Sequence, residues 1–225
     1  MNVLTFASRK GGSGKSTLAA HLAAYAHRQS QPCLLVDDDP QGSLTLWNTL
    51  RDERALPLRT VKRSISDVLK KAKGDGADWV FVDTPPNMSA SVVDAIEAAT
   101  LVIIPCRPGV FDIDAVQETI SFARQMRTPY AVVINGAPPK RQDAESAAVA
   151  YARFTLAQMG VPIWGGQVTQ RSNFALALAA GQGAKEYDGD DGSADEIGRL
   201  WNAIAKSVKA IRGARDGSGM HRIAA

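Results

Sequence analysis

Short apolar runs alternate with longer stretches of helical periodicity from one end of the chain to the other. The apolar runs place Val, Ile, Leu and Phe at successive positions, which is typical of strands buried on both faces of a sheet. Because helical stretches separate them, the pattern predicts a doubly wound, mostly parallel α/β sheet with helices on both faces. The predicted strands are residues 2–7, 33–37, 58–61, 79–83, 101–105, 130–135 and 161–166. The predicted helices are residues 17–29, 43–51, 64–73, 88–99, 114–126, 145–159, 173–181 and 196–211.

The alternation runs without an internal repeat or a linker, so a single domain is expected over residues 1–212. The remaining residues, 213–225, are rich in glycine and are expected to form a flexible basic tail. A chain of 225 residues can bury about 70% of its extended surface, which is enough for one sizeable core.

The composition, with 45% hydrophobic and 22% charged residues, is that of a soluble globular protein and excludes a disordered or collagen-like chain. No apolar run approaches the roughly 18 to 20 residues that a spanning helix needs, so we expect the chain in the cytoplasm. Cys33 and Cys106 lie in apolar runs, where buried free thiols are expected rather than a disulfide.

The net charge of +3 is too small to indicate a nucleic-acid partner, but the charges are unevenly distributed. Residues 186–196 contain six acidic and no basic residues, whereas residues 198–225 contain six basic residues and one acidic residue. This pattern fits either a solvated acidic loop before a basic helix or a functional basic end, and the sequence leaves both open.

The segment after the first predicted strand, KGGSGKST from Lys10 to Thr17, predicts a phosphate-binding loop of the P-loop NTPase type. Its glycines allow the backbone to curl around an anion, and the amides at the start of the next helix face the phosphate. Lys15 adds a positive charge, and the Ser16 hydroxyl can ligate Mg²⁺. The nucleotide-binding residues expected here are Gly11, Gly12, Ser13, Gly14, Lys15, Ser16 and Thr17.

Polar residues also follow later strands, at the sheet edge where ligands bind in such folds. The second strand ends in the run Asp37, Asp38 and Asp39, and the fourth strand ends at Asp83. Asn135 ends a further strand and precedes a glycine, so it is either a turn residue or a purine contact through its side-chain amide.

The string KGGSGKST resembles the deviant Walker A loop of the ParA/MinD ATPases, whose hallmark is an additional lysine near the start of the loop. The segments LLVDDDPQGS and VFVDTPPN are similar to the second acidic motif and the Walker B segment of the same family. No helix-turn-helix extension precedes the first strand, so the sequence resembles the small ParA-type partition ATPases.

This resemblance implies ATP and Mg²⁺ as cofactors and a role for each matching residue. Lys15 is expected to bind the β- and γ-phosphates, with Lys15, Lys10 and Asp39 forming the catalytic set. Ser16 would ligate Mg²⁺ directly, while Asp37 and Asp83 would hold it through water. Asp39 would orient the attacking water, a role that suits phosphoryl transfer because positioning supplies most of the catalysis.

Three further positions follow from the same resemblance. Lys10 is expected to reach across an ATP-sandwich homodimer to the phosphates of the partner. Asn135 would contact adenine, and Asp38 occupies a variable position where a solvated or turn-capping aspartate is expected.

The function implied by the resemblance is that of a positioning ATPase. As an ATP-bound dimer it would bind DNA non-specifically, become nucleoid-associated, and be released when a centromere-binding or cargo-adaptor protein stimulates hydrolysis. Arg171 matches a DNA-contacting position of the family, and Lys185 lies nearby in sequence. The cargo, whether a plasmid, a chromosome or another large assembly, is not specified.

Two other functions exist on this scaffold. A MinD-like membrane-cycling ATPase would use residues 197–211 as a basic amphipathic helix, although a last helix packed on the sheet has the same apolar stripe. An iron–sulfur enzyme needs cysteines near the nucleotide motifs, and the segment after Asp83 contains none. Because a last helix packed on the sheet accounts for the stripe of residues 197–211, a membrane partner is not expected.

Overall fold

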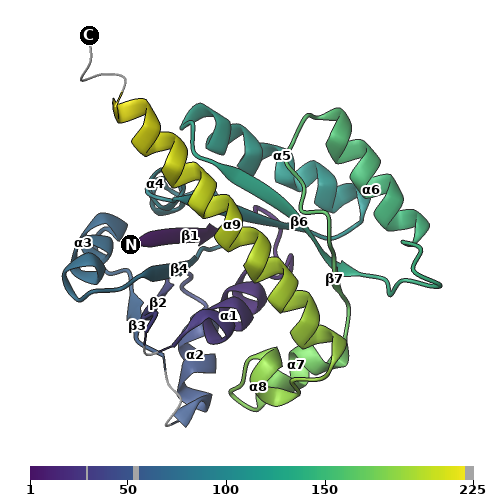
Figure 1. Ribbon diagram of the computed structural model, residues 1–225, viewed down its shortest axis with the longest axis horizontal. Coiled ribbons are helices and arrows are strands. Elements are labelled where there is room, and N and C mark those ends of the chain that lie inside the picture. The colour runs from purple at the N-terminus through teal and green to yellow at the C-terminus, as the bar shows by residue number, and fades with distance from the viewer. Residues whose placement is uncertain (29, 53–55, 221–225) are drawn as a thin grey trace.

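A seven-stranded, entirely parallel sheet forms the centre of the molecule (Figure 1). The computed structural model describes residues 1–28, 30–52 and 56–220. The strand order is β3-β2-β4-β1-β5-β6-β7, so the predicted doubly wound α/β class is confirmed. The strands are β1 (Asn2–Phe6), β2 (Cys33–Asp37), β3 (Leu58–Thr60), β4 (Trp79–Asp83), β5 (Leu101–Cys106), β6 (Tyr130–Ala137) and β7 (Val168–Thr169).

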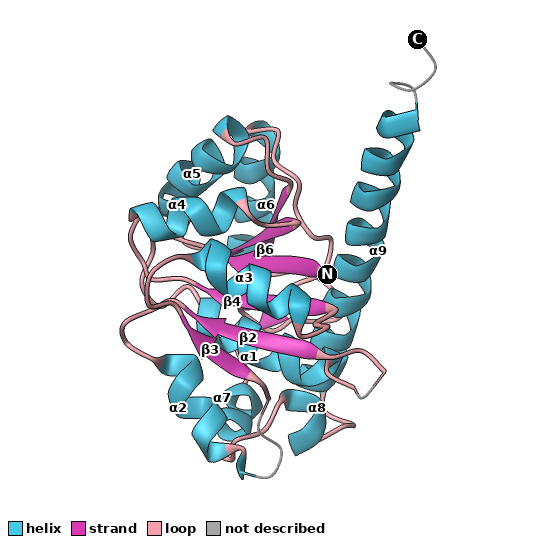
Figure 2. Cartoon of the chain, turned by 90° about the vertical axis from the view of Figure 1, so that its left-hand side faces the viewer, coloured by secondary structure: helices cyan, strands magenta, loops and turns pink. Residues whose placement is uncertain are grey.

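Helices cover both faces of the sheet, with α1, α2, α7, α8 and α9 on one face and α3 to α6 on the other (Figure 2). The first group consists of α1 (Lys15–Ala26), α2 (Ser43–Leu50), α7 (Ser172–Ala179), α8 (Ala184–Tyr187) and α9 (Gly192–Met220). The second group consists of α3 (Ile65–Gly74), α4 (Ala90–Glu97), α5 (Val110–Gln125) and α6 (Ala147–Gln158).

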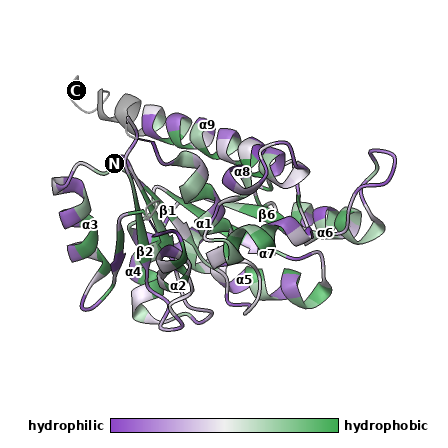
Figure 3. Cartoon of the chain, turned by 90° about the horizontal axis from the view of Figure 1, so that it is seen from below, coloured by the Kyte–Doolittle hydropathy of each residue, from purple (hydrophilic) through white to green (hydrophobic). Residues whose placement is uncertain are grey.

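Alternating side chains divide the interior into cores on either side of the sheet. Leu4 and Phe6 of β1 belong to the core beneath α1 and α9, while Val3 belongs to the core beneath α3. Phe81 and Val80 of β4 alternate in the same way, because successive residues of a strand point to opposite faces. The central strands are therefore mainly apolar on both faces, and they lie in the hydrophobic centre of Figure 3.

The apolar stripe of α9 packs onto the sheet. Trp201 lies 4.7 Å from the Trp79 ring and 6.0 Å from the Phe81 ring, measured between ring centroids. Ile197 and Ile204 of the same stripe are also buried. The stripe is therefore part of the core. Most polar residues of α9 up to Arg212 are exposed (Figure 3), whereas Ser193 and Glu196 near its start are buried.

The strand predicted at residues 161–166 is wrong. Ile163 makes only an isolated bridge to Val132, and the last strand of the sheet is Val168–Thr169. Pro162 has no amide hydrogen for a ladder, and Gly165 and Gly166 interrupt the segment before pairing with β6 resumes.

The last helix, α9, continues to Met220, beyond residue 212 where the sequence led us to end the domain. A helix that is already nucleated and packed can propagate through weak helix formers such as the glycines of this segment. Residues 221–225 lie outside the described residues, and the division into a domain and a flexible tail stays a prediction.

The order of the strands places a ligand crevice at β1. After β1, the chain builds β2, β3 and β4 on one side, and then crosses to build β5, β6 and β7 on the other. Ligands in open parallel sheets bind beyond the carboxyl ends of the strands at such a switch point. The loop between β1 and α1 lies at this position.

Candidate functional site

The loop from β1 to α1 forms an anion cradle. Gly12 and Gly14 have φ values of 72° and 98°, a left-handed conformation that glycine adopts without strain. Gly14 is the N-cap of α1 and provides no side-chain cap, so the first amides of the helix remain available to a ligand. A phosphate at this helix end also benefits from the helix dipole.

Asn135 at the end of β6 is tied to this loop. Its side chain is buried, and its Nδ2 donates a hydrogen bond of 2.7 Å to the Ser13 carbonyl oxygen. The Asn135 side chain also occupies the space where a Cβ on Gly14 would lie, so position 14 must be glycine. Because one N–H of the amide pairs with this carbonyl, Oδ1 and the second N–H are left for a ligand.

Lys15 lies inside the loop. Its side chain is buried, and Nζ donates a hydrogen bond of 3.2 Å to the Ser8 carbonyl oxygen. Burial lowers the pKa of Lys15, while the charges of Asp83 and Asp39 act in the opposite direction. The ammonium group therefore lies near two carboxylates, Asp83 at the end of β4 and Asp39 after β2.

Asp83 provides a buried carboxylate beside Ser16. Neither of its oxygens accepts a hydrogen bond of normal geometry within the described structure. Burial raises the pKa of Asp83 to about 7, the nearby Ser16 hydroxyl opposes this rise, and the charge of Asp37 adds to it. Asp37 is paired in register with Asp83 on the neighbouring strand. A carboxylate with unused lone pairs beside a hydroxyl is chemically suited to a hydrated cation.

These residues fit Mg²⁺ held mainly through water. Among the described residues, no three His, Cys, Asp or Glu side chains converge on a point where they could hold a metal ion themselves. Mg²⁺ usually keeps several waters and binds one or two protein groups together with substrate phosphates. Ser16 could provide a direct oxygen, while Asp37 and Asp83 could hold the bound waters.

The three aspartates after β2 have different partners. Asp37 Oδ2 accepts hydrogen bonds of 2.8 Å from both the amide and the hydroxyl of Thr45, which fixes the start of α2. Asp38 Oδ2 accepts a hydrogen bond of 2.7 Å from the Ser91 hydroxyl, and burial raises the pKa of Asp38. Asp39 Oδ1 caps its own turn by accepting from the Gln41 amide, and Asp39 lines the cleft.

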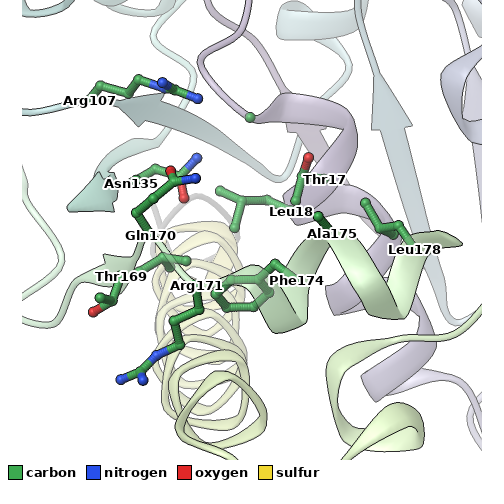
Figure 4. A pocket seen from close by; sticks show the side chains of 13 residues that line it. Thr17, Leu18, Arg107, Asn135, Thr169, Gln170, Arg171, Phe174, Ala175 and Leu178 are labelled. Atoms are coloured by element: carbon green, nitrogen blue, oxygen red, sulfur yellow. The ribbon is translucent and has the colours of Figure 1, made fainter. Parts of the chain in front are cut away.

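Two connected cavities make up the cleft. The phosphate-side cavity is lined mainly by the loop, Asp39 and the start of α2; its residues include Gly11, Gly12, Gly14, Lys15, Ser16, Thr17, Asp39 and Trp47. The base-side cavity lies between β6 and α7, and its lining includes Asn135, Gly136, Gln170, Arg171, Phe174 and Leu178 (Figure 4). Lys10 is exposed and lines neither cavity.

The two positions expected to contact DNA lie outside the phosphate-side cavity. Arg171 is the N-cap residue of α7, and its Nη2 lies 3.0 Å from Oε1 of the buried Glu196 in α9. Glu196 also accepts a hydrogen bond from the Thr169 amide. Lys185 is exposed on α8, with Nζ 5.1 Å from the centroid of the Tyr25 ring.

Sequence reasoning missed several residues that shape the site. Arg107 follows β5 and lines both cavities, so the rule that pointed to the ends of β2 and β4 could also have found it. Ser91 and Glu196 act through partners that are distant in sequence, whereas Thr45 donates to Asp37 eight residues before it, and no local signal marks any of the three.

A glycine-rich loop between the central strand and a helix, with a buried lysine and an acidic strand end beside it, defines a P-loop nucleotide-binding domain. A family model described as CobQ/CobB/MinD/ParA nucleotide binding domain matches residues 4–184. The chain therefore belongs to this family, and its resemblance to the ParA/MinD ATPases is confirmed.

Individual relatives agree with this assignment. The chain is 39% identical over 115 residues to "Protein ParA" of Rhizobium radiobacter, an alignment that covers 50% of this chain and only 51% of that protein. It is 31% identical over 163 residues to "Maintenance of carboxysome distribution protein A" of Gloeobacter kilaueensis, covering 71% of this chain and 73% of that protein. A structure of a Cyanothece McdA variant with ATP has the same fold, with a TM-score of 0.70, 18% identity and coverage of 95% and 96% of the two chains.

Replacing Lys15 by Met should strongly weaken nucleotide binding. The buried ammonium is the cation that opposes the carboxylates of the cleft, and its loss removes a charge-assisted contact to phosphate. We expect the affinity for MgADP to fall roughly a hundredfold in a calorimetric titration. Lys70→Met, at an exposed position of α3, is the matched control, and an unchanged affinity of the Lys15→Met variant would contradict the site.

Proposed function

We propose that the chain is a small partition ATPase that positions DNA or another large cargo. Two ATP-loaded protomers form a sandwich dimer, bind DNA non-specifically, and separate after a partner protein stimulates hydrolysis. The ParA and carboxysome-distribution relatives support a role in positioning. The location that follows is the cytoplasm, with the ATP-bound form on the nucleoid.

The observation that carries this proposal is that one lysine of the loop is buried in the cleft and another is exposed outside it. Lys15 is buried within the cleft, whereas Lys10 is exposed and lines neither cavity. An exposed lysine outside the cavities of its own protomer can neutralise phosphates bound by a second copy facing it. The dimer would then depend on nucleotide, because two facing triphosphates repel each other without this cation.

Asp39 is our candidate for the residue that orients the attacking water. One of its oxygens is fixed by the Gln41 amide, and the carboxylate lies in the lining of the phosphate-side cavity. Asp38 is bonded to Ser91 and is not part of that lining, which favours Asp39. Mg²⁺, when bound, would neutralise charge that develops on the phosphates.

The orientation of Asn135 supports adenine as the base. One N–H of its amide pairs with the Ser13 carbonyl, so the side chain still offers a ligand the Oδ1 acceptor and a second N–H donor. The exocyclic amino group of adenine donates a hydrogen bond, whereas guanine has a carbonyl oxygen at the same position. The base-side cavity should therefore favour ATP over GTP.

A basic surface near Arg171 is the best candidate for DNA contact. A cavity there is lined by Lys140, Arg171 and Arg199, together with Asp143 and Glu196. Glu196 neutralises part of the Arg171 charge and Asp195 Oδ2 lies 3.6 Å from Arg199 Nη1, while Lys140 is exposed beside them. Non-specific DNA binding requires phosphate neutralisation alone, and a dimer presents such a surface twice.

The membrane-cycling alternative receives less support. The apolar stripe of α9, with Ile197, Trp201 and Ile204, is buried against the sheet and is not available to a bilayer. Within the described part of the chain, no helix combines the length and apolar character required to span a membrane.

Replacing Lys10 by Ala should prevent ATP-dependent dimerisation without affecting nucleotide loading. We expect the variant to bind MgADP like the unmodified protein, because Lys10 lies outside the cavities of its own protomer. Light scattering with MgATP should report a monomer for Lys10→Ala and a dimer for Lys70→Ala. A normal dimer of the Lys10→Ala variant would show that this lysine has no role across the interface.

Replacing Arg171 by Gln should weaken DNA binding by the ATP-loaded protein. Removing one phosphate contact from each protomer should reduce the slope of log affinity against log salt by about 2 per dimer. Mobility shifts on unrelated DNA fragments measure this effect, and Arg63→Gln, at an exposed arginine before α3, is the control.

The same experiment separates the two functional classes. Sedimentation with anionic liposomes should show no ATP-dependent binding. Binding to liposomes but not to DNA would transfer the proposal to a membrane-cycling ATPase.

A further inference from the structure

Arg107 is an exposed arginine at the point where the two cavities of the cleft meet. It directly follows β5, and of the residues that the structure describes only Gly14, Thr17, Arg107 and Leu178 line both cavities. Arg107 is the charged member of this set. In Figure 4, its side chain extends from the end of β5 above Asn135 toward the start of α1.

No hydrogen bond or ion pair engages the Arg107 guanidinium among the residues that the structure describes. Its position is nevertheless defined by packing. If Gly136 carried a Cβ, this atom would lie 3.5 Å from Arg107 Nε and 3.6 Å from Arg107 Cγ. The arginine stem therefore lies against the bare backbone at the end of β6, and its donors are left for a ligand.

A nucleotide that extends from the base-side cavity into the phosphate-side cavity must pass this boundary. With the base near Asn135 and the terminal phosphates near Lys15, the group at the boundary is the first phosphate after the ribose. Lys15 lines the phosphate-side cavity but not the base-side cavity. Among the described residues, Arg107 is therefore the one cation that lines both cavities. A guanidinium offers a planar set of donors that matches phosphate oxygens.

We infer that Arg107 holds the α-phosphate of the bound nucleotide and positions the phosphate chain between its two ends. This inference rests on the proposed nucleotide site and adds a residue to it. Since ATP and ADP share the α-phosphate, Arg107 should contribute to the binding of both. Lys10, in contrast, should matter only when two protomers face each other.

The test compares Arg107→Gln with Arg63→Gln in titrations with MgADP and with inorganic tripolyphosphate and Mg²⁺. Glutamine keeps part of the stem over Gly136 and removes the charge. We expect Arg107→Gln to lose roughly tenfold in affinity for both probes, as for one charge-assisted hydrogen bond. Arg63→Gln, an exposed arginine that lines neither cavity, should bind like the unmodified protein.

The two probes distinguish the alternatives. A loss for MgADP with unchanged tripolyphosphate binding would mean that Arg107 contacts the base or ribose, and it would overturn the phosphate assignment. Unchanged affinity for both probes, or an equal loss in Arg63→Gln, would overturn it as well. Equal thermal unfolding midpoints of the two nucleotide-free variants would show that the fold is intact.

If the unmodified protein itself failed to bind MgADP, the nucleotide site would be refuted rather than the role of Arg107. The two failures are therefore distinguishable in one set of titrations.

Discussion

The concentration of carboxylates at the ends of β2 and β4 is the constraint on which the site depends. Asp37 and Asp83 are paired in register on neighbouring strands. Asp83 is fully buried, and neither of its carboxylate oxygens accepts a hydrogen bond of normal geometry within the described structure. Lys15 is the buried cation that opposes these charges. Such an arrangement is unfavourable by itself, because a buried charge requires partners. A hydrated Mg²⁺ with a phosphate chain would provide them. The bound ligand would therefore balance the buried charges of the cleft.

The fold connects the two ends of this cleft. Asn135 comes from β6 and the loop glycines follow β1, two strands on either side of β5. The hydrogen bond from Asn135 to Ser13 joins them, and Gly14 permits the close approach. The end of β6 and the phosphate loop thus form one connected unit, in which Asn135 helps to fix the shape of the loop.

Much of the fold could be predicted because strands buried on both faces form largely apolar runs instead of alternating apolar and polar residues. The phosphate loop was also readable, since its glycines, lysine and serine are adjacent in sequence. The seventh strand could not be placed, because Gly165 and Gly166 shift pairing to Val168, and that register depends on β6. Glu196 appeared in the sequence as part of an acidic run, yet it is buried and paired with Arg171, a contact between segments 25 residues apart. Pairings of this kind depend on tertiary packing and leave no local signal.

The central claim is that the buried carboxylates and Lys15 form a site for nucleotide together with Mg²⁺. A calorimetric titration of the unmodified protein with ATP, in the presence and absence of Mg²⁺, tests it most directly. The account predicts one nucleotide per chain and much tighter binding with Mg²⁺, because the ion screens the phosphates from Asp37 and Asp83. Binding of equal strength without Mg²⁺, or no binding in either condition, would contradict it.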